Sequence, residues 1–428
     1  MLSLGQLITG TIEDLAFGGA GIMRHAGQVV FIPFTAPGDS VEAEITAIKP
    51  RFAQAQLKQV LNPGPDRIKP RCPYFGSCGG CQLQHLNYAA QLRYKQQSVQ
   101  AVLTRLGGIS QFEIEMHPAT PHWHYRRHIH LQLRRKEGSG FVCGYIGVDN
   151  ISLVQAATCP IFLEEQSVVL QQINELAAAL PAGRIQTGRL AIFKTARGLL
   201  AHFHFGEALP IASQEIFKQF LGANREWCGI EVSSPGQSHL VGEESLLYET
   251  NGLVIEASSR AFLQNHPQQS ALIYQTLLEL TKNTSGKLLD TYCGLGATSI
   301  LFSKNGWQVT GIEYNAQAVQ LARRNAARNE SQVNFLQGKT EDLLRRELLK
   351  QKPDLVLLNP PKTGLHKKVV QELCEFAPKQ LLYISCQPAT LARDVASLKE
   401  KYDIQSCQAF DMFPQTAHVE TLLSLRAK

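Results

Sequence analysis

Strand-like and helix-like segments alternate regularly after about residue 270, and only a few architectures accommodate that order. Aliphatic runs with strand character occur at residues 287–289, 308–312, 354–358 and 380–385, with helical patterns between them. Parallel neighbours in a sheet need a long crossover, which a helix usually provides. The C-terminal part of the chain is therefore predicted to be a doubly wound α/β domain with a mostly parallel sheet.

The N-terminal part follows a different pattern. Strand-like runs at residues 6–12, 28–33, 40–49 and 54–60 are separated by turns rich in Gly and Pro. Short strands at this spacing predict a small β-barrel. Residues 66–255 have a mixed α+β pattern, with predicted helices at 88–106 and 164–179 and predicted strands at 128–133 and 190–194. Because 428 residues suit several domains, we expect three, which span residues 1–62, 66–255 and 256–428.

Charge and cysteine content narrow the functional class. The net charge is +6, a mildly basic balance that is compatible with nucleic-acid binding. No run approaches the roughly 20 apolar residues of a membrane span, and the N-terminus lacks the basic segment of a signal peptide. We therefore expect a cytoplasmic protein without a membrane partner, and we infer no obligate protein partner. Ten cysteines in such a protein point to metal binding or catalysis rather than to disulfides.

Three of these cysteines are closely spaced, in the pattern Cys72-x5-Cys78-Gly-Gly-Cys81, and Cys159 is a candidate fourth ligand. The two glycines allow the chain to wrap tightly around a metal centre. Four thiolates suit either structural zinc or an iron–sulfur cluster, and the spacing does not choose between them. Buried cysteines without a metal are the remaining interpretation.

The segment Asp290-Thr-Tyr-Cys-Gly-Leu-Gly296 joins the first predicted strand of the α/β domain to a helix. Glycines at this position allow a ligand to approach the backbone closely. Glu313 follows at the end of the next strand, where a carboxylate can hold two ribose hydroxyls. Because the loop lacks both the third glycine of the dinucleotide fingerprint and the Gly-Lys-Ser/Thr of a P-loop, it favours S-adenosylmethionine over NAD or ATP. A tight structural turn is the alternative.

Two further strand ends carry candidate residues. Asn359-Pro-Pro-Lys362 is similar to the Asn-Pro-Pro-aromatic motif of methyltransferases that act on exocyclic amines, but Lys362 replaces the aromatic residue. A rigid turn beside the cofactor is the alternative there. Cys386 lies between a strand and a helix, where the helix N-terminus lowers a thiol pKa and favours a nucleophile. An inert buried cysteine is the alternative at that position.

Two motifs are less specific. His418-Val-Glu420 could place a general base on a late strand, although a surface glutamate is the better interpretation from these residues alone. Residues 125–136 alternate apolar and polar side chains. They predict a half-buried strand with one basic face, which suits RNA phosphates and solvent about equally well.

Together these motifs resemble the uracil-C5 RNA methyltransferases, specifically the type with a TRAM domain and an iron–sulfur cluster that acts on 23S ribosomal RNA. The likeness covers nearly the whole chain. Gly18–Ile22 and Val30–Gly38 are similar to the TRAM barrel, an OB-like RNA-binding module. The most specific part of the match is Ser385-Cys-Gln-Pro-Ala-Thr390 together with His418-Val-Glu420.

The resemblance implies a role for each candidate residue. It makes four cysteines the ligands of a [4Fe–4S] cluster in the central domain, namely Cys72, Cys78, Cys81 and Cys159. It assigns S-adenosylmethionine contacts to Gln264 (in the segment Phe262-Leu-Gln264), Tyr292, Glu313 and Asn359. It makes Cys386 the nucleophile and Glu420 the base. The chain also departs from the family, which has Asp-Pro-Pro-Arg at 359–362 and other residues at His266 and Ala297.

The resemblance also implies a covalent mechanism on RNA. Attack of the Cys386 thiolate on uracil C6 makes C5 reactive toward the sulfonium methyl, and Glu420 then removes the C5 proton so that the cysteine can leave. Because the uracil must leave its stack to expose C6, single-stranded or loop RNA is expected. The expected target is 23S rRNA, with a tRNA uridine as the alternative. A non-catalytic RNA-binding or folding factor and an amine N-methyltransferase are the competing classes.

Overall fold

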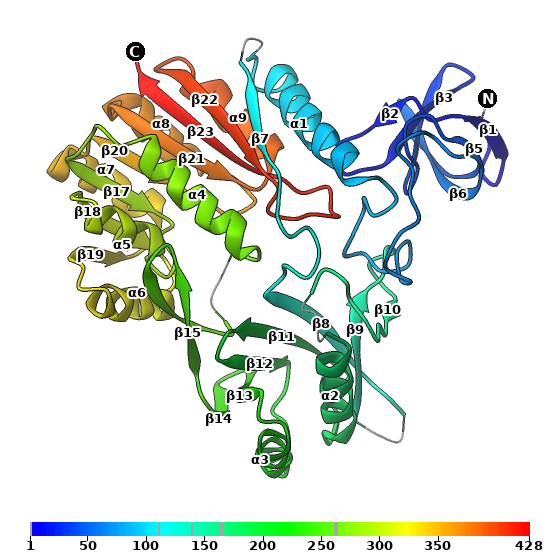
Figure 1. Cartoon of the computed structure of the whole chain (residues 1–428), viewed down its shortest axis with the longest axis horizontal. Helices are drawn as coiled ribbons and strands as arrows, with labels where there is room; N and C mark the ends of the chain where they lie inside the picture. The colour runs from blue at the N-terminus through cyan, green and yellow to red at the C-terminus, as the bar shows by residue number, and fades with distance from the viewer. Residues whose placement is uncertain (1, 110–111, 138–139, 163–165, 261–263) are drawn as a thin grey trace.

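The computed structural model of the chain describes residues 2–109, 112–137, 140–162, 166–260 and 264–428. Three large sheets form three lobes, and a two-stranded hairpin lies between two of them (Figure 1). No helix in these ranges combines the length and the apolarity that crossing a bilayer requires.

The N-terminal lobe is a six-stranded sheet in the order β1-β5-β6-β4-β3-β2. Its strands are β1 (Leu7–Thr11), β2 (Asp14–Leu15), β3 (Gly21–His25), β4 (Gln28–Ile32), β5 (Ser40–Ile48) and β6 (Phe52–Asn62). Val30, Val41 and Ala53 are fully buried in its core. The sequence predicts β1, β4, β5 and β6 but misses β2 and β3, because the glycines around residue 19 indicate only a turn.

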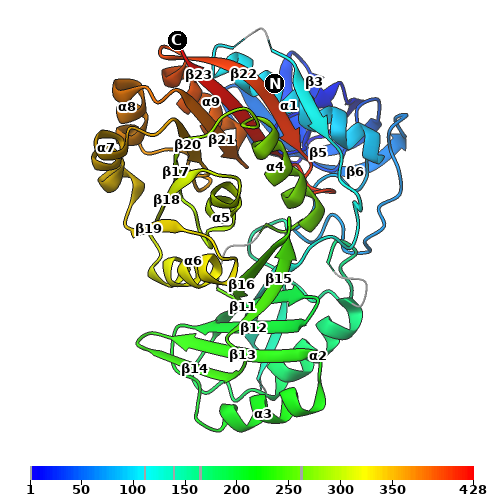
Figure 2. The same ribbon diagram turned by 60° about the vertical axis from the view of Figure 1, so that its left-hand side comes forward.

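The central lobe is a seven-stranded sheet in the order β10-β9-β8-β11-β12-β13-β14. Its strands are β8 (His128–Arg135), β9 (Phe141–Ile146), β10 (Leu153–Val154), β11 (Thr187–Thr195), β12 (Gly198–Phe205), β13 (Trp227–Ser234) and β14 (Gln237–Gly242). Helices α2 (Gln166–Ala179) and α3 (Ser213–Ala223) cover one face (Figure 2). The predicted start of α2, at residue 164, lies outside the described residues. On β8, as predicted, buried apolar residues alternate with more exposed polar ones.

The third lobe is an eight-stranded sheet in the order β19-β18-β17-β20-β21-β23-β22-β7. Its strands are β7 (Ile114–His117), β17 (Lys287–Thr291), β18 (Gln308–Glu313), β19 (Val333–Gln337), β20 (Leu355–Leu358), β21 (Gln380–Ser385), β22 (Tyr402–Phe410) and β23 (Glu420–Ala427). The five strands from β19 to β21 run parallel, and β23 is antiparallel to β21. The predicted α/β domain with a mostly parallel sheet is confirmed.

Helices cover both faces of this sheet (Figures 1 and 2). Those with apolar residues in the core on one face are α1 (Tyr88–Arg105), α7 (Thr340–Gln351), α8 (Lys367–Phe376) and α9 (Pro388–Leu398). Those on the other side are α4 (Pro267–Glu279), α5 (Ala297–Lys304) and α6 (Ala316–Arg328). The hairpin of β15 (Ser245–Thr250) and β16 (Leu253–Ser258) packs against α5 and α6.

Two elements within the expected central range, 66–255, are part of the C-terminal lobe instead: one is a strand of its sheet and the other is a helix packed on that sheet. Strand β7 pairs in parallel with β22 at the sheet edge. Helix α1 buries Val99 and Leu103 against the same core as Val395 of α9. Neither element carries a local signal of its distant partner, so the three-domain division misplaces both.

Candidate active site

The loop that joins β17 to α5, residues 292–296, has several residues with left-handed backbones. Tyr292, Gly294 and Gly296 have φ angles of 60°, 55° and 80°, a conformation that glycine adopts without steric cost. A Cβ atom on Gly294 would meet no atom within 4 Å, whereas one on Gly296 would lie 2.7 Å from Phe335 Cζ. Gly294 therefore leaves the backbone open to a ligand, and Gly296 allows close packing beneath the loop.

Three of the four predicted cofactor residues meet at the carboxyl ends of adjacent strands. Glu313 ends β18, and its Oε2 accepts a hydrogen bond from Gly294 N at 3.0 Å. Asn359 follows β20, whose Leu358 pairs with Thr291, the residue before Tyr292. Tyr292, Glu313 and Asn359 thus line one edge of the sheet around the glycine loop.

The fourth, Gln264, lies in a different environment. It lines a small pocket of about 20 Å³ with Arg127 and Tyr248. Its Oε1 is buried and has no hydrogen-bond partner among the described residues. Phe262 and Leu263, the rest of the predicted segment, lie outside those residues. A buried acceptor without a donor is suited to a ligand amine.

Two residues at this edge were missed by the sequence analysis. Tyr314, next to Glu313, is 66% exposed, with Lys339 Nζ 5.8 Å from its ring centroid. Thr340 begins α7 and lies near Tyr292. Burial raises the pKa of the Tyr292 hydroxyl to about 12, and the hydrogen bond with the Thr340 hydroxyl acts in the opposite direction. The position of Tyr314 directly after Glu313 could have indicated it, because an aromatic ring follows the predicted cofactor carboxylate. Thr340 was missed because β19, the strand before it, was not predicted.

Cys386 and Glu420 lie side by side. Ser385 of β21 pairs with Thr421 of β23 in an antiparallel register. Cys386 and Glu420, the residues just beyond this pair on each strand, are therefore neighbours. Glu420 is only 3% exposed, so the interpretation as a surface glutamate is wrong. Burial raises the pKa of Glu420 to about 8.

The environment of the Cys386 thiol differs from the prediction. Burial, together with the charge of Glu420, raises the pKa of the Cys386 thiol to about 11, against the opposing effect of Lys362. The sequence predicts a lowered pKa from the N-terminus of α9, but loss of hydration outweighs a helix dipole. Lys362, which seemed only a departure from the family motif, is therefore the cation that favours the thiolate.

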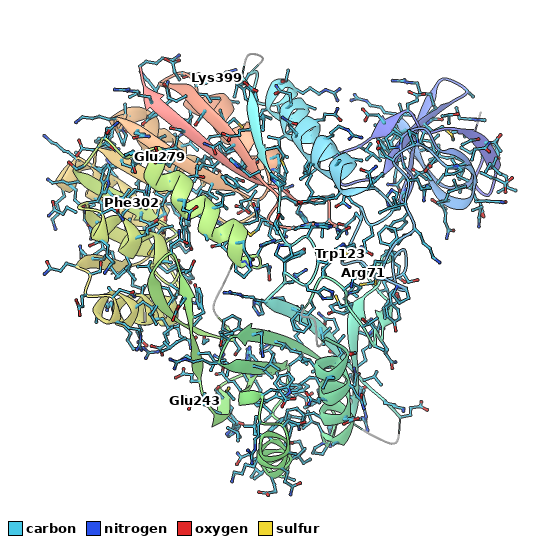
Figure 3. The ribbon with its side chains drawn as sticks, in the orientation of Figure 1. Arg71, Trp123, Glu243, Glu279, Phe302 and Lys399 are labelled. Carbon is cyan, nitrogen blue, oxygen red and sulfur yellow. The ribbon has the colours of Figure 1, made fainter. Side chains whose placement is uncertain are left out.

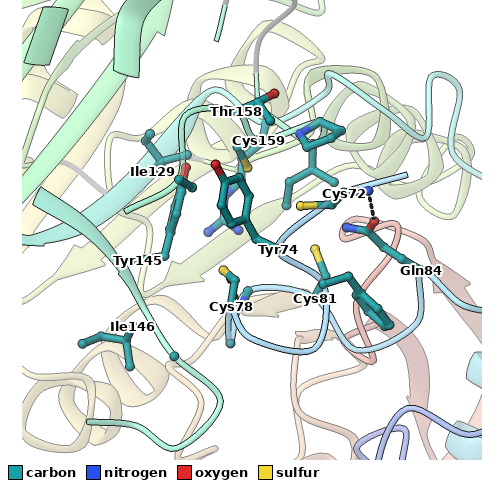
Figure 4. Close-up of a pocket in the computed structure, with 18 of the residues that line it drawn as sticks. Cys72, Tyr74, Cys78, Cys81, Gln84, Ile129, Tyr145, Ile146, Thr158 and Cys159 are labelled. Atoms are coloured by element: carbon teal, nitrogen blue, oxygen red, sulfur yellow. Dashed lines mark hydrogen bonds between the residues drawn. The ribbon is translucent and has the colours of Figure 1, made fainter. Parts of the chain in front are cut away.

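The four predicted metal ligands face one cavity of about 350 Å³ (Figure 4). The first three lie on a loop whose turns include a hydrogen bond from Cys78 N to Tyr74 O at 2.8 Å. Cys159 approaches from the other side, and the electrostatic influence of its thiol on the other three shows that the four sulfurs are near neighbours. Burial raises the pKa of the Cys81 thiol to about 12.

The arrangement of the four cysteines does not by itself identify a metal centre. Within the described ranges, no group of three or more His, Cys, Asp or Glu side chains is arranged to hold one metal ion. Zinc requires sulfurs about 2.3 Å from one centre. A cluster with several irons spreads its thiolates farther apart, because each iron takes its own cysteine. Four thiolates suit both kinds of centre, so the [4Fe–4S] cluster stays a prediction.

Comparison with known proteins gives the family. The model of the tRNA (uracil-5-)-methyltransferase family matches residues 239–428, and that of the TRAM domain matches residues 3–58. An RNA methyltransferase of Protochlamydia amoebophila, itself uncharacterized, is 42% identical over all of this chain and 99% of its own length. The chain belongs to the uracil-C5 RNA methyltransferase family. Another uncharacterized family member, from Bacillus anthracis, is 32% identical over all of this chain and 98% of its own.

A solved structure of this family resembles the whole chain. It is the tRNA (uracil-54, C5)-methyltransferase of Pyrococcus abyssi in complex with S-adenosyl-L-homocysteine. The TM-score is 0.76 at 25% identity, over 98% of this chain and 100% of that one.

Proposed function

We propose that this methyltransferase transfers a methyl group from S-adenosylmethionine to C5 of a uridine in RNA, through a covalent bond between Cys386 and uracil C6. The observation that carries the proposal is the placement of a thiol beside a buried carboxylate at the carboxyl edge of the sheet. Methylation at C5 needs both groups beside the same uracil, because the thiolate activates the ring and the carboxylate removes the proton from C5.

The cofactor residues support this assignment. Tyr292, Glu313 and Asn359 surround the open glycine loop, and Glu313 is placed for the ribose hydroxyls. Gln264 offers an unpaired acceptor to the amino group of the cofactor. When bound, S-adenosylmethionine supplies an electrophilic methyl group.

The chain supplies the remaining chemistry. The Cys386 thiolate, favoured by Lys362, adds to C6 of the uracil and makes C5 a nucleophile. After methylation, C5 still carries its hydrogen, and Glu420 takes this proton. The C5–H electron pair then restores the C5–C6 double bond, and the cysteine leaves as a thiolate. Cys386→Ala should therefore abolish both the adduct and methylation, whereas Glu420→Gln should leave a methylated adduct.

Denaturing gels with substrate RNA and labelled cofactor test this division of roles. The expected pattern is a labelled protein–RNA band with Glu420→Gln and none with Cys386→Ala. Methylation by Cys386→Ala would exclude Cys386 as the nucleophile. Normal turnover by Glu420→Gln would assign the base to another group.

For the substrate, we propose 23S rRNA, with tRNA as the alternative. The resemblance favours the ribosomal target, whereas the P. abyssi relative acts on tRNA. At the centre of the molecule, the Arg71 guanidinium lies 5.3 Å from the centroid of the Trp123 ring, where an aromatic face could stack on a base (Figure 3). Mapping 5-methyluridine in rRNA and tRNA with and without the gene decides between the two. No change in either would favour a non-catalytic RNA-binding factor.

For the cysteine site, we propose a [4Fe–4S] cluster held by Cys72, Cys78, Cys81 and Cys159. The shared cavity and the all-thiolate donor set suit such a centre, and the resemblance favours iron–sulfur over zinc. Because no step of uracil methylation transfers an electron, its role would be structural.

A further inference from the structure

The loop between β22 and β23, residues 411–419, leads directly into Glu420 and is held from outside its own sheet. Tyr88 and Lys95 project from one face of α1 toward it. The Tyr88 hydroxyl donates to Asp411 Oδ2 at 2.8 Å, and Lys95 Nζ donates to Asp411 Oδ1 at 2.5 Å. Lys95 Nζ also donates to Phe413 O at 3.0 Å. The start of the loop is therefore fixed by a fully buried ion pair.

Gln91, between those two positions on α1, holds the middle of the loop. Gln415 N donates to Gln91 Oε1 at 3.0 Å, and Gln91 Nε2 donates back to Gln415 Oε1 at 3.0 Å. Both side chains are buried, with exposures of 1% and 2%. Gln415 has a φ of 70°, a left-handed conformation that a non-glycine residue keeps only when its surroundings impose it. This reciprocal pair is part of what imposes it.

The loop that carries Cys72, Cys78 and Cys81, here called the cysteine loop, holds the same turn from the other side. Gln82 N and Leu83 N, which follow Cys81, donate to Gln415 O at 3.2 and 3.0 Å. Ala417 N donates to Gln82 Oε1 at 3.3 Å. Tyr125, which packs against Cys81, donates its hydroxyl to Pro414 O at 3.0 Å. A few hydrogen bonds thus join the cysteine site to the loop that leads into Glu420.

We propose that Gln91 and Gln82 are positioning residues for the base, because they fix the 411–419 loop so that the Glu420 carboxylate can reach the C5 proton. The inference rests on the proposed function, in which Glu420 removes that proton. Neither glutamine touches the reacting atoms. In this account, the cysteine site contributes to catalysis by fixing Gln82, without contact to the substrate.

Gln91→Met tests the inference, because methionine keeps the length of the side chain and removes its hydrogen bonds. Methyl transfer should stay near the wild-type rate. Loss of the cysteine from the methylated base should slow on the order of 10- to 100-fold, the effect of a small displacement of a catalytic group. A labelled protein–RNA adduct should therefore accumulate on denaturing gels.

Matched variants separate positioning from general damage. Gln96, also on α1, donates from Nε2 to Ile114 O of β7 at 2.8 Å, so Gln96→Met loses a comparable bond away from the loop and should turn over as the wild type. Gln82→Met should accumulate the adduct, as Gln91→Met does. Gln82→Glu keeps the acceptor for Ala417 N and should restore turnover. If Gln91→Met does not fold, the comparison of Gln82→Met with Gln82→Glu decides whether these glutamines position the base.

The outcomes distinguish this inference from the proposed function. An adduct with Glu420→Gln but none with either glutamine variant overturns the positioning role alone. Equal slowing of methyl transfer and of elimination also overturns it, because the glutamines would then be structural. No adduct with any variant, Glu420→Gln included, removes the base assignment, and the inference falls with it.

Discussion

An ionised Glu420 makes Cys386 harder to ionise, because two acids that share a buried site oppose each other's negative charge. Burial already raises the pKa of Glu420 to about 8, so the carboxyl of the free protein holds its proton at neutral pH. At the scale of the residue, the proposed base is therefore kept where its charged form is disfavoured, and its ionisation has a cost in free energy.

That cost predicts how stability depends on pH. Between about pH 4.5 and 8, the folded protein keeps a proton on Glu420 that the unfolded chain has released, so the free energy of unfolding falls as pH rises through this range. Glu420→Gln removes the effect. The variant should gain stability over the wild type at pH 8, by an amount on the order of a few kcal/mol, and the gain should vanish near pH 4.5.

Thermal or urea unfolding at pH 5 and pH 8.5 measures this difference. Glu375→Gln is a control, because Arg345 lowers the pKa of the Glu375 carboxyl from its ordinary 4.5. This carboxyl is therefore ionised in both states from pH 5 to 8.5, and the effect of the variant on stability should not change over that range. The same pH dependence of stability in Glu420→Gln and in the wild type between pH 5 and 8.5 would show that Glu420 is not the group responsible.

At the scale of the element, two glycines in the turn from β17 into α5 have different surroundings. Gly294 faces open space and Gly296 faces Phe335 and Ala322. Both have positive φ, so any side chain at either position adds backbone strain. Only at Gly296 does the added Cβ also collide with the packed core of the domain.

The two positions should therefore respond differently to alanine. Gly296→Ala should lower the free energy of unfolding by about 2–4 kcal/mol, from strain plus overpacking. Gly294→Ala should lower it by only about 1–2 kcal/mol, yet weaken S-adenosylmethionine binding, because its methyl group enters the space left for the ligand. Calorimetric titration and urea unfolding of both variants measure this. Equal losses of stability with unchanged binding would mean that Gly294 does not line the cofactor site.

At the scale of the whole molecule, contacts between lobes connect the N-terminal sheet to the catalytic one. The Tyr94 hydroxyl on α1 donates to Ala16 O and accepts from Gly18 N, both at 3.0 Å. The ion pair of Arg67 with buried Asp39, at 2.6 Å, holds the linker against the N-terminal sheet. The cysteine loop lies between these contacts and the 411–419 loop, so its order affects both.

A cluster at this junction should be detectable in the purified protein. Anaerobically prepared protein should be brown, with about four irons per chain. Cys81→Ser should lose the iron. Cys143→Ser, which alters a buried cysteine outside the cavity, should keep it. Iron analysis and visible absorption measure this, and a colourless protein with stoichiometric zinc would contradict the cluster.

The sequence by itself determined the elements whose signals are local. The alternation of strands and helices predicted the parallel sheet, and Gly294, Gly296 and Glu313 indicated a nucleotide-type site because strand ends of a parallel sheet share an edge. The cysteine spacing predicted a metal site, since three cysteines lie within ten residues, and this stays a prediction.

Tertiary structure alone decided what depends on distant partners. The pairing of β7 with β22, and the contacts of Gln91 and Lys95 with a loop more than 300 residues away, have no local signal. Burial of Glu420 reversed the surface interpretation, and burial of Cys386 reversed the expected direction of its pKa shift. The physical reason is the same in each case: hydration and pairing of a polar group are set by everything packed around it, and its neighbours in the chain are only a small part of that surrounding.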